Sequence, residues 1–274
     1  MTDTASNIKI TNVTPKLAEQ WLAKNTHNRN LRKAVVNAYA SDMANGDWSW
    51  NGEAVKFAKD GTLVDGQHRL SAIVQSGVTI KMLVIRGVEK ESQHTMDTGA
   101  KRTPGDMLKL RGEKNYNPLA AGIRACILWE QGARSFTGRS GGTQTTNTQI
   151  LRYLENNPVM REYASKFQSL KSHVPMPASV GFLAHKLFYE IDYDDAEHFF
   201  NRLASDEGHY KGDPVYALRK ILLSPKEAGK LQYTPTYKLA VTIKAWNKFR
   251  AGEEVKLLAY RPGGANPEKF PEPI

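Results

Sequence analysis

The spacing of apolar residues in the first part of the chain predicts a mixture of helices and strands. Thr14 followed by Pro15 is typical of a helix N-cap with proline at the first helical position. Apolar residues then recur at helical spacing from Leu31 to Met43, and Gly46 is expected to end that helix. Short apolar runs between turn residues follow, which predict strands at 54–57, 63–64 and 80–85 and a helix at 67–76.

Beyond Asn115 the pattern changes, because strand-like runs nearly vanish and helical spacing dominates. A polar segment, Ser135–Thr148, separates the first expected helix from the later ones. The helices are expected at 118–131, 148–156, 178–190, 196–204 and 237–249. The sequence therefore predicts an α+β fold, with a small mixed domain at 1–115, an all-helical domain at 116–260 and an irregular, Pro- and Gly-rich tail at 261–274.

The composition fits a globular protein with a basic surface. The chain has 274 residues, of which 40% are hydrophobic, and a formal net charge of +10. A positive balance of this size attracts polyanions, so DNA or RNA is a plausible partner. No apolar run approaches the roughly 20 residues that span a bilayer, and the polar start lacks a signal-peptide core. We therefore expect a cytoplasmic protein without membrane contact.

Cysteine and histidine usage limits the metal chemistry that the chain can perform. The single cysteine, Cys126, excludes an intrachain disulfide and a multi-cysteine metal site. It lies among apolar residues of an expected helix, which predicts a buried structural thiol. The seven histidines show no zinc-ligand spacing, so no zinc is expected.

A candidate anion site lies where an expected strand passes through a glycine turn into a helix. The first N–H groups of a helix lack partners within it, and the helix dipole is positive there. Gly66 lets the backbone approach a phosphate closely. Arg69 can bind two phosphate oxygens, and His68 can donate a further hydrogen bond. Asp65 can cap the helix or help to hold a metal ion on the phosphates.

The same residues also fit an ordinary structural role. An Asp-Gly pair before a helix is common cap chemistry, and Arg69 can pair with a carboxylate. Local physical chemistry therefore leaves phosphate binding and a structural role both open.

The segment Gly66–Ala72 resembles the phosphate-binding box of the ParB/sulfiredoxin superfamily. ParB proteins carry Gly-Glu-Arg-Arg at this place, and sulfiredoxins carry Gly-Cys-His-Arg. The spelling Asp-Gly-Gln-His-Arg also resembles a phage and bacterial subgroup associated with DNA modification. Asn28 and Arg29 resemble an upstream Asn…Arg element, and the expected order of helices and strands is similar over about residues 8–95.

The resemblance implies that Gly66, Gln67, His68 and Arg69 line a nucleotide triphosphate and that Arg29 is a second phosphate contact. Gln67 stands where sulfiredoxins have their cysteine, so sulfinic-acid repair by that thiol is excluded. Gln67 also replaces the ParB glutamate, and His68 replaces the first ParB arginine. The choice between ATP and CTP is therefore open.

Lys101, Arg102 and Thr103 form a second candidate phosphate site. They precede a helix that the capping-box pattern at 103–106 predicts, so two cations lie beside a helix N-terminus. A surface turn with solvated Lys101 and Arg102 fits the same residues.

These features predict a nucleotide-dependent protein that acts on or with DNA, as in phage DNA modification or processing. In this hypothesis ATP or CTP is hydrolysed or its phosphoryl group is transferred, which needs positioning and charge neutralisation more than a nucleophile. Asp65 or Glu53 would hold Mg²⁺ or accept a proton. The residues expected to act in catalysis are Gln67, His68, Arg69 and Glu53.

Two non-catalytic hypotheses stay open beside this one. In the first, the same basic turn binds the backbone of DNA or RNA and the helical domain contacts a partner. In the second, the chain is an assembly or inhibitory protein that retains the fold without the chemistry. A homo-oligomer is compatible with each hypothesis.

Overall fold

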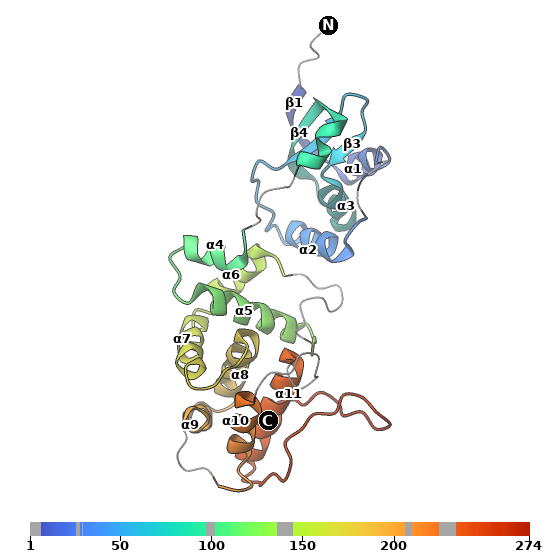
Figure 1. The fold of residues 1–274 in the computed structure, drawn as a ribbon. Coiled ribbons are helices and arrows are strands. Elements are labelled where there is room, and N and C mark those ends of the chain that lie inside the picture. Colours follow the sequence, from blue (N-terminus) through green and yellow to red (C-terminus); the bar gives the residue numbers. More distant parts are fainter. Residues whose placement is uncertain are drawn as a thin grey trace. The chain divides into compact units, whose positions relative to one another are not determined.

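The computed structural model describes residues 7–25, 28, 30–96, 102–135, 145–205, 210–224 and 234–274. They belong to two compact units. The sheet unit comprises residues 1–101 and 141–149, and the helical unit comprises residues 102–140 and 150–274. A small mixed sheet followed by a helical region confirms the predicted α+β fold class (Figure 1).

The sheet unit is built on four strands in the order β1-β4-β2-β3. The central strands β2 and β4 run parallel, whereas β1 and β3 are antiparallel to their neighbours. A parallel pair needs a crossover connection, which β3 and helix α3 provide here. The strands are β1 (Asn7–Val13), β2 (Ala54–Ala58), β3 (Leu63–Asp65) and β4 (Ile80–Val88).

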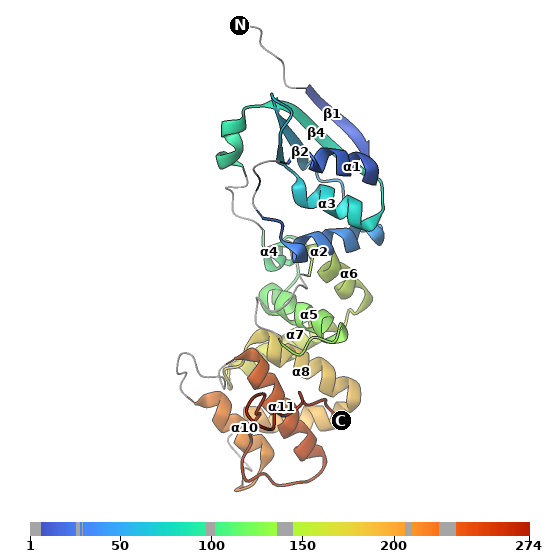
Figure 2. The ribbon, with the colours of Figure 1, turned by 90° about the vertical axis from the view of Figure 1, so that its right-hand side faces the viewer.

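Helices α1 (Pro15–Leu22), α2 (Lys33–Ala44) and α3 (Gln67–Ser76) accompany this sheet. Helix α3 packs against both α1 and α2, and Figure 2 shows α1 and α3 over the same side of the strands. Leu70 and Ile73 of α3 are fully buried, as the helical spacing predicted. The core between helices and sheet also contains Val13, Val55, Phe57, Met82 and Val84.

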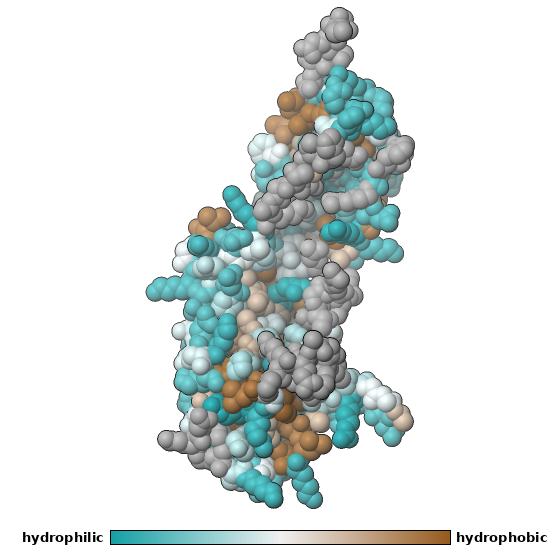
Figure 3. Space-filling view, in the orientation of Figure 1, coloured by the Kyte–Doolittle hydropathy of each residue, from teal (hydrophilic) through white to brown (hydrophobic). Residues whose placement is uncertain are grey.

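The opposite face of the sheet carries apolar side chains from β1 and β4. The strand register places Ile8 opposite Ile85 and Ile10 opposite Leu83. Ile8 is 61% exposed and Ile10 is 54% exposed. Figure 3 shows apolar surface over this end of the sheet unit. The sequence pattern did not predict β1, in which Val13 alone is buried.

The helical unit begins earlier in the chain than expected. Helix α4 (Pro104–Leu110) packs on α5 (Tyr116–Glu130), and Leu108 of α4 is fully buried in the core of the helical unit. The structure therefore divides the chain between Lys101 and Arg102, whereas the sequence pattern placed the boundary at residue 115.

The described residues contain six more helices, and α8 is surrounded by the helices that it contacts. It packs against α5, α7, α9 and α11, and every residue from Val180 to Tyr189 is buried, as expected of a helix that is surrounded by others. None of the described helices is long and apolar enough to cross a membrane. The six are α6 (Asn147–Asn156), α7 (Met160–Lys171), α8 (Ala178–Ile191), α9 (Tyr193–Ala204), α10 (Pro214–Leu223) and α11 (Pro235–Arg250).

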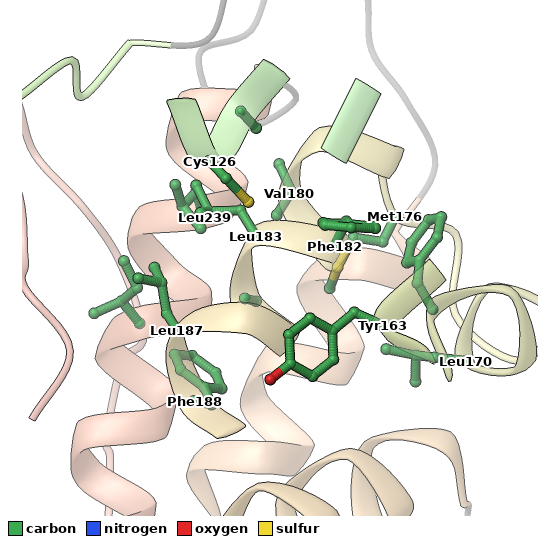
Figure 4. Packing of buried hydrophobic residues seen from close by; sticks show 14 of the residues in the cluster. Cys126, Tyr163, Leu170, Met176, Val180, Phe182, Leu183, Leu187, Phe188 and Leu239 are labelled. Carbon is green, nitrogen blue, oxygen red and sulfur yellow. The ribbon is translucent and has the colours of Figure 1, made fainter. Parts of the chain in front are cut away.

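The core of the helical unit joins side chains from distant parts of the chain. Figure 4 shows Phe182 and Phe188 of α8 together with Cys126 of α5, Tyr163 of α7 and Leu239 of α11. Cys126 is 1% exposed, which confirms the predicted buried thiol. Burial in this apolar environment raises the pKa of its thiol, because the thiolate would lose its hydration.

The chain after Arg250 forms neither helix nor strand, as expected for 261–274, yet it is held against the helical unit. The indole Nε1 of Trp246 donates a hydrogen bond of 3.0 Å to the carbonyl oxygen of Ile274. The guanidinium of Arg134 binds both carboxylate oxygens of Glu272, at 2.7 and 3.1 Å.

His185 is a buried titratable group at the centre of the helical unit. Its ring stacks on Phe200 with 3.8 Å between centroids, and its Nδ1–H donates a 2.6 Å hydrogen bond to the carbonyl of Gly181. Burial lowers the pKa of His185 to about 4, because the imidazolium form would lose its hydration.

We expect the protein to lose stability as the pH falls from 6.5, the ordinary pKa of histidine, to about 4. In that range the unfolded chain binds a proton at residue 185 that the folded chain does not, so acid favours unfolding. The full decrease in the free energy of unfolding is about 3 kcal/mol. Urea unfolding at a series of pH values measures it, with His185→Gln as a neutral control. Equal pH dependence of the two proteins would contradict this assignment.

Gly122 of α5 is expected to be intolerant of a side chain. A β-carbon there would lie 2.0 Å from Cγ of Phe182, so the ring would have to move within a packed core. Gly122→Ala should destabilise the protein by about 1–3 kcal/mol, although alanine favours helix. Gly263→Ala is the control, because open space surrounds Gly263. Thermal unfolding of both variants measures the difference in stability. Equal unfolding midpoints for Gly122→Ala and Gly263→Ala would rule out the steric argument.

Candidate functional site

The turn before α3 requires glycine for two reasons. Gly66 has a left-handed backbone with φ of +102°, which strains residues that carry a side chain. A β-carbon on Gly66 would lie 3.0 Å from Cγ2 of Val55 and 3.2 Å from its Cα. The start of α3 is thus in direct contact with β2, and the expected order of strand, glycine turn and helix is present.

Asp65 does not act as the cap of α3. The N-cap residue of this helix is Gly66, which has no side chain. The Asp65 carboxylate lies 3.0 Å from Nζ of Lys56 and 3.4 Å from Nη2 of Arg69. Because two cations already neutralise it, Asp65 is poorly suited to hold Mg²⁺. The described residues also contain no group of three or more His, Cys, Asp or Glu side chains arranged around a metal.

Arg69 lies in the first turn of α3, and its guanidinium extends to the start of β2. Its Nη2 donates a 2.8 Å hydrogen bond to the carbonyl oxygen of Ala54, and its Nη1 lies 3.1 Å from the carboxylate of Glu53. The side chain of Arg69 is 11% exposed, whereas that of Glu53 is 59% exposed. The guanidinium is therefore held by the Ala54 carbonyl and the Asp65 carboxylate, and it also pairs with the solvent-exposed carboxylate of Glu53.

Gln67 is part of a polar network that joins the start of α3 to the segment after α1. It is 5% exposed, and its Oε1 accepts a 3.0 Å hydrogen bond from Nδ2 of Asn25. Nδ2 of Asn28 donates to Oδ1 of Asn25 at 2.6 Å and to the carbonyl of Leu63 at 2.7 Å. The amide of Gln67, which we expected to touch a nucleotide, thus has a protein partner.

His68 contacts the backbone that leads into α2. Its Nε2 accepts a 3.1 Å hydrogen bond from the backbone N–H of Arg32, so this nitrogen does not donate to a phosphate in this arrangement. Arg29, the expected second phosphate contact, lies outside the described residues.

The second candidate site already contains an anion from the chain itself. The hydroxyl of Thr103 accepts a 3.1 Å hydrogen bond from the backbone N–H of Asp106, and the backbone N–H of Thr103 donates to the Asp106 carboxylate at 2.8 Å. These bonds form the predicted capping box. The backbone N–H and the hydroxyl of Thr103 both donate to the Asp106 carboxylate, which lowers the pKa of Asp106. Arg102 is exposed, and Lys101 lies outside the described residues. The geometry here is that of an ordinary capped turn.

A surface cavity of about 350 Å³ lies in the helical unit, away from both candidate sites in sequence. Lys244 in its wall pairs with Glu268 at 3.2 Å. Its lining mixes cations with carboxylates: Lys244, Lys248, Lys256 and Arg261 with Glu254 and Glu268.

We expect Gly66→Ala to destabilise the sheet unit more than Gly77→Ala does. Both glycines have positive φ, which costs about 1–2 kcal/mol for a residue with a side chain. A β-carbon at Gly77 meets nothing within 4 Å, whereas one at Gly66 would press on Val55. Urea unfolding of the two variants isolates this contact, and equal losses of stability would show that it is unimportant.

Comparisons of the chain with models of protein families, with curated proteins and with solved structures give no match. The resemblance of Gly66–Ala72 to the ParB/sulfiredoxin superfamily therefore stays a prediction based on those residues and on the order of elements. The structure places the arginine of this motif at the start of β2, beside an exposed carboxylate.

Proposed function

We propose that the sheet unit binds the phosphates of a nucleotide, ATP or CTP, at the start of α3, and that the protein acts on or with DNA. The observation that carries this proposal is the setting of Arg69. Its guanidinium is held by the Ala54 carbonyl and by Asp65, and its other ion-pair partner, Glu53, is 59% exposed at the side chain.

A phosphate group can take the place of the Glu53 carboxylate at Arg69. An exposed ion pair contributes little stability, typically about 0–1 kcal/mol, so the carboxylate can leave at low cost. A phosphate oxygen would gain a charge-assisted hydrogen bond from a guanidinium that is already ordered. The positive end of the α3 dipole lies in the same turn, which favours the same anion.

The charge of the chain supports DNA as the partner. A net charge of +10 raises the local concentration of a polyanion and accelerates its association. Some of the basic residues already pair with carboxylates, such as Arg111 with Glu155 at 3.0 Å. We therefore attribute the attraction of DNA to the net positive charge of the protein and not to a defined basic groove. We place this activity in the cytoplasm.

Binding without turnover is the second candidate, and the contacts of the motif favour it. Gln67 is hydrogen-bonded to Asn25, and Asp65 is paired with Lys56 and Arg69. A glutamine that orients water and an aspartate that holds Mg²⁺ would both have to leave these partners. In this case the nucleotide acts as a ligand that controls the contact with DNA.

Calorimetry with ATP, CTP and GTP tests the proposed site through Arg69→Ala. Loss of a charged hydrogen bond worth about 1.5–3 kcal/mol should weaken nucleotide binding at least about tenfold. Arg111→Ala, which removes an exposed arginine of the helical unit, should leave the affinity unchanged. Glu53→Gln should strengthen binding, because it removes the competing carboxylate.

The same variants distinguish the alternatives. If no nucleotide binds, and Arg69→Ala changes only the affinity for DNA and its salt dependence, the turn contacts a nucleic-acid backbone instead. If nucleotide binds but phosphate release does not exceed the rate without protein, the chain is a nucleotide-dependent binder and not an NTPase.

A further inference from the structure

The outer edge of β1 has the properties of a pairing surface. The strand lies at one end of the sheet order, and its seven residues pair with β4 in unbroken register from Asn7 opposite Arg86 to Val13 opposite Ile80. By contrast, both pairings of β2 contain a register shift. Natural edge strands are often protected by proline, bulges or charged side chains, lysine above all. β1 has no proline, no bulge against β4 and one charged residue, Lys9.

The apolar residues at this edge form a strip on the open face of the sheet. Ile8 and Ile10 are 61% and 54% exposed, and Ile85 and Leu83 of β4, which lie opposite them, are partly exposed. The strip ends at the edge strand, and another strand paired there would continue it. No other described strand pairs with this edge. An apolar strip that runs to such an edge marks a site of strand addition.

We propose that two copies of this chain associate through antiparallel pairing of their β1 strands, with Ile10 of one copy opposite Ile10 of the other. A two-fold axis perpendicular to the sheet keeps both open faces on the same side, so even-numbered residues face even-numbered ones. This register places Ile8 opposite Asn12 and Lys9 opposite Thr11, and no like charges meet.

Of the two neighbouring symmetric registers, the one centred on Lys9 is disfavoured by charge. Centring the pair on Lys9 would place two lysines directly opposite each other, which destabilises an antiparallel pair. The Ile10-centred pair instead joins the apolar strips of both copies into one surface that crosses the interface. The sequence of β1 is therefore self-complementary, which argues for a second copy over an unrelated strand.

The first test measures the oligomeric state of the full chain by sedimentation over a dilution series. The wild type should show a monomer–dimer equilibrium, and Ile10→Lys should raise the dissociation constant at least about tenfold, because two ammonium groups would meet. Leu257→Lys is the matched control, since it changes another exposed apolar residue, 71% exposed, in the helical unit. Far-UV circular dichroism checks that both variants are folded.

A charge-reversal mixture separates self-association from other occupants of the edge. Ile10→Glu copies should also be monomeric, but an equal mixture of Ile10→Glu and Ile10→Lys copies should recover dimers, because opposite charges then meet across the axis. A wild type that stays monomeric at every concentration overturns the proposal. So does a mixture without recovery, because another partner would then explain the exposed strip.

Cysteine crosslinking tests the register itself. The native Cys126 is buried, so an added cysteine supplies the reactive thiol. Ile10→Cys should form an intermolecular disulfide on mild oxidation, because directly opposite residues have Cα atoms about 4.5–5.5 Å apart. Asn12→Cys should crosslink far more slowly, since Ile8 faces it. Equal crosslinking of both variants would overturn the proposed pairing.

Discussion

The contact between Gly66 and Val55 sets the geometry of the sheet unit. Because the backbone of the turn touches the Cα region of β2, α3 starts directly against the sheet. An arginine in the first turn of that helix can then reach the Ala54 carbonyl at the beginning of the same strand. A larger residue at the turn would move the helix outward, and the guanidinium would lose its place. The close packing of one glycine thus determines where a charged group several residues away can act.

The polar contacts around the motif show why its role could not be predicted from local sequence. Spacing along the chain predicted that Gln67, His68 and Arg69 lie at a helix start, and they do. Their partners come from elsewhere: Asn25 lies 42 positions from Gln67, and Arg32 lies 36 positions from His68. Such pairs depend on how α1, α2 and β3 assemble. Without knowledge of those partners, the same residues fit either a nucleotide-binding site or a structural contact between helices and strands.

Helices that are bounded by glycine and bury one face were predicted well from the sequence. Gly66 and Gly77 bound α3 at both ends, and its inward residues have helical spacing. β1 was missed because its apolar residues face away from the core. Helices α7 and α10 were missed although their buried residues recur at helical spacing, as Tyr163, Phe167 and Leu170 do in α7. The helical spacing that predicts these two helices is therefore present in the sequence. The division of the chain near residue 101 could not be predicted in this way, because it depends on the packing of α4 against α5.

The sheet unit is discontinuous in sequence, because residues 141–149 return to it after the chain has entered the helical unit. Thr146 in this return segment donates a 3.0 Å hydrogen bond to Asp42 of α2, whose side chain is almost fully enclosed. During synthesis on the ribosome, the first 101 residues therefore emerge without part of their final packing. That packing is completed only when the return segment has left the exit tunnel, by which time α5 has already been made. The sheet unit can therefore complete its packing only after residues 102–140 of the helical unit have been made.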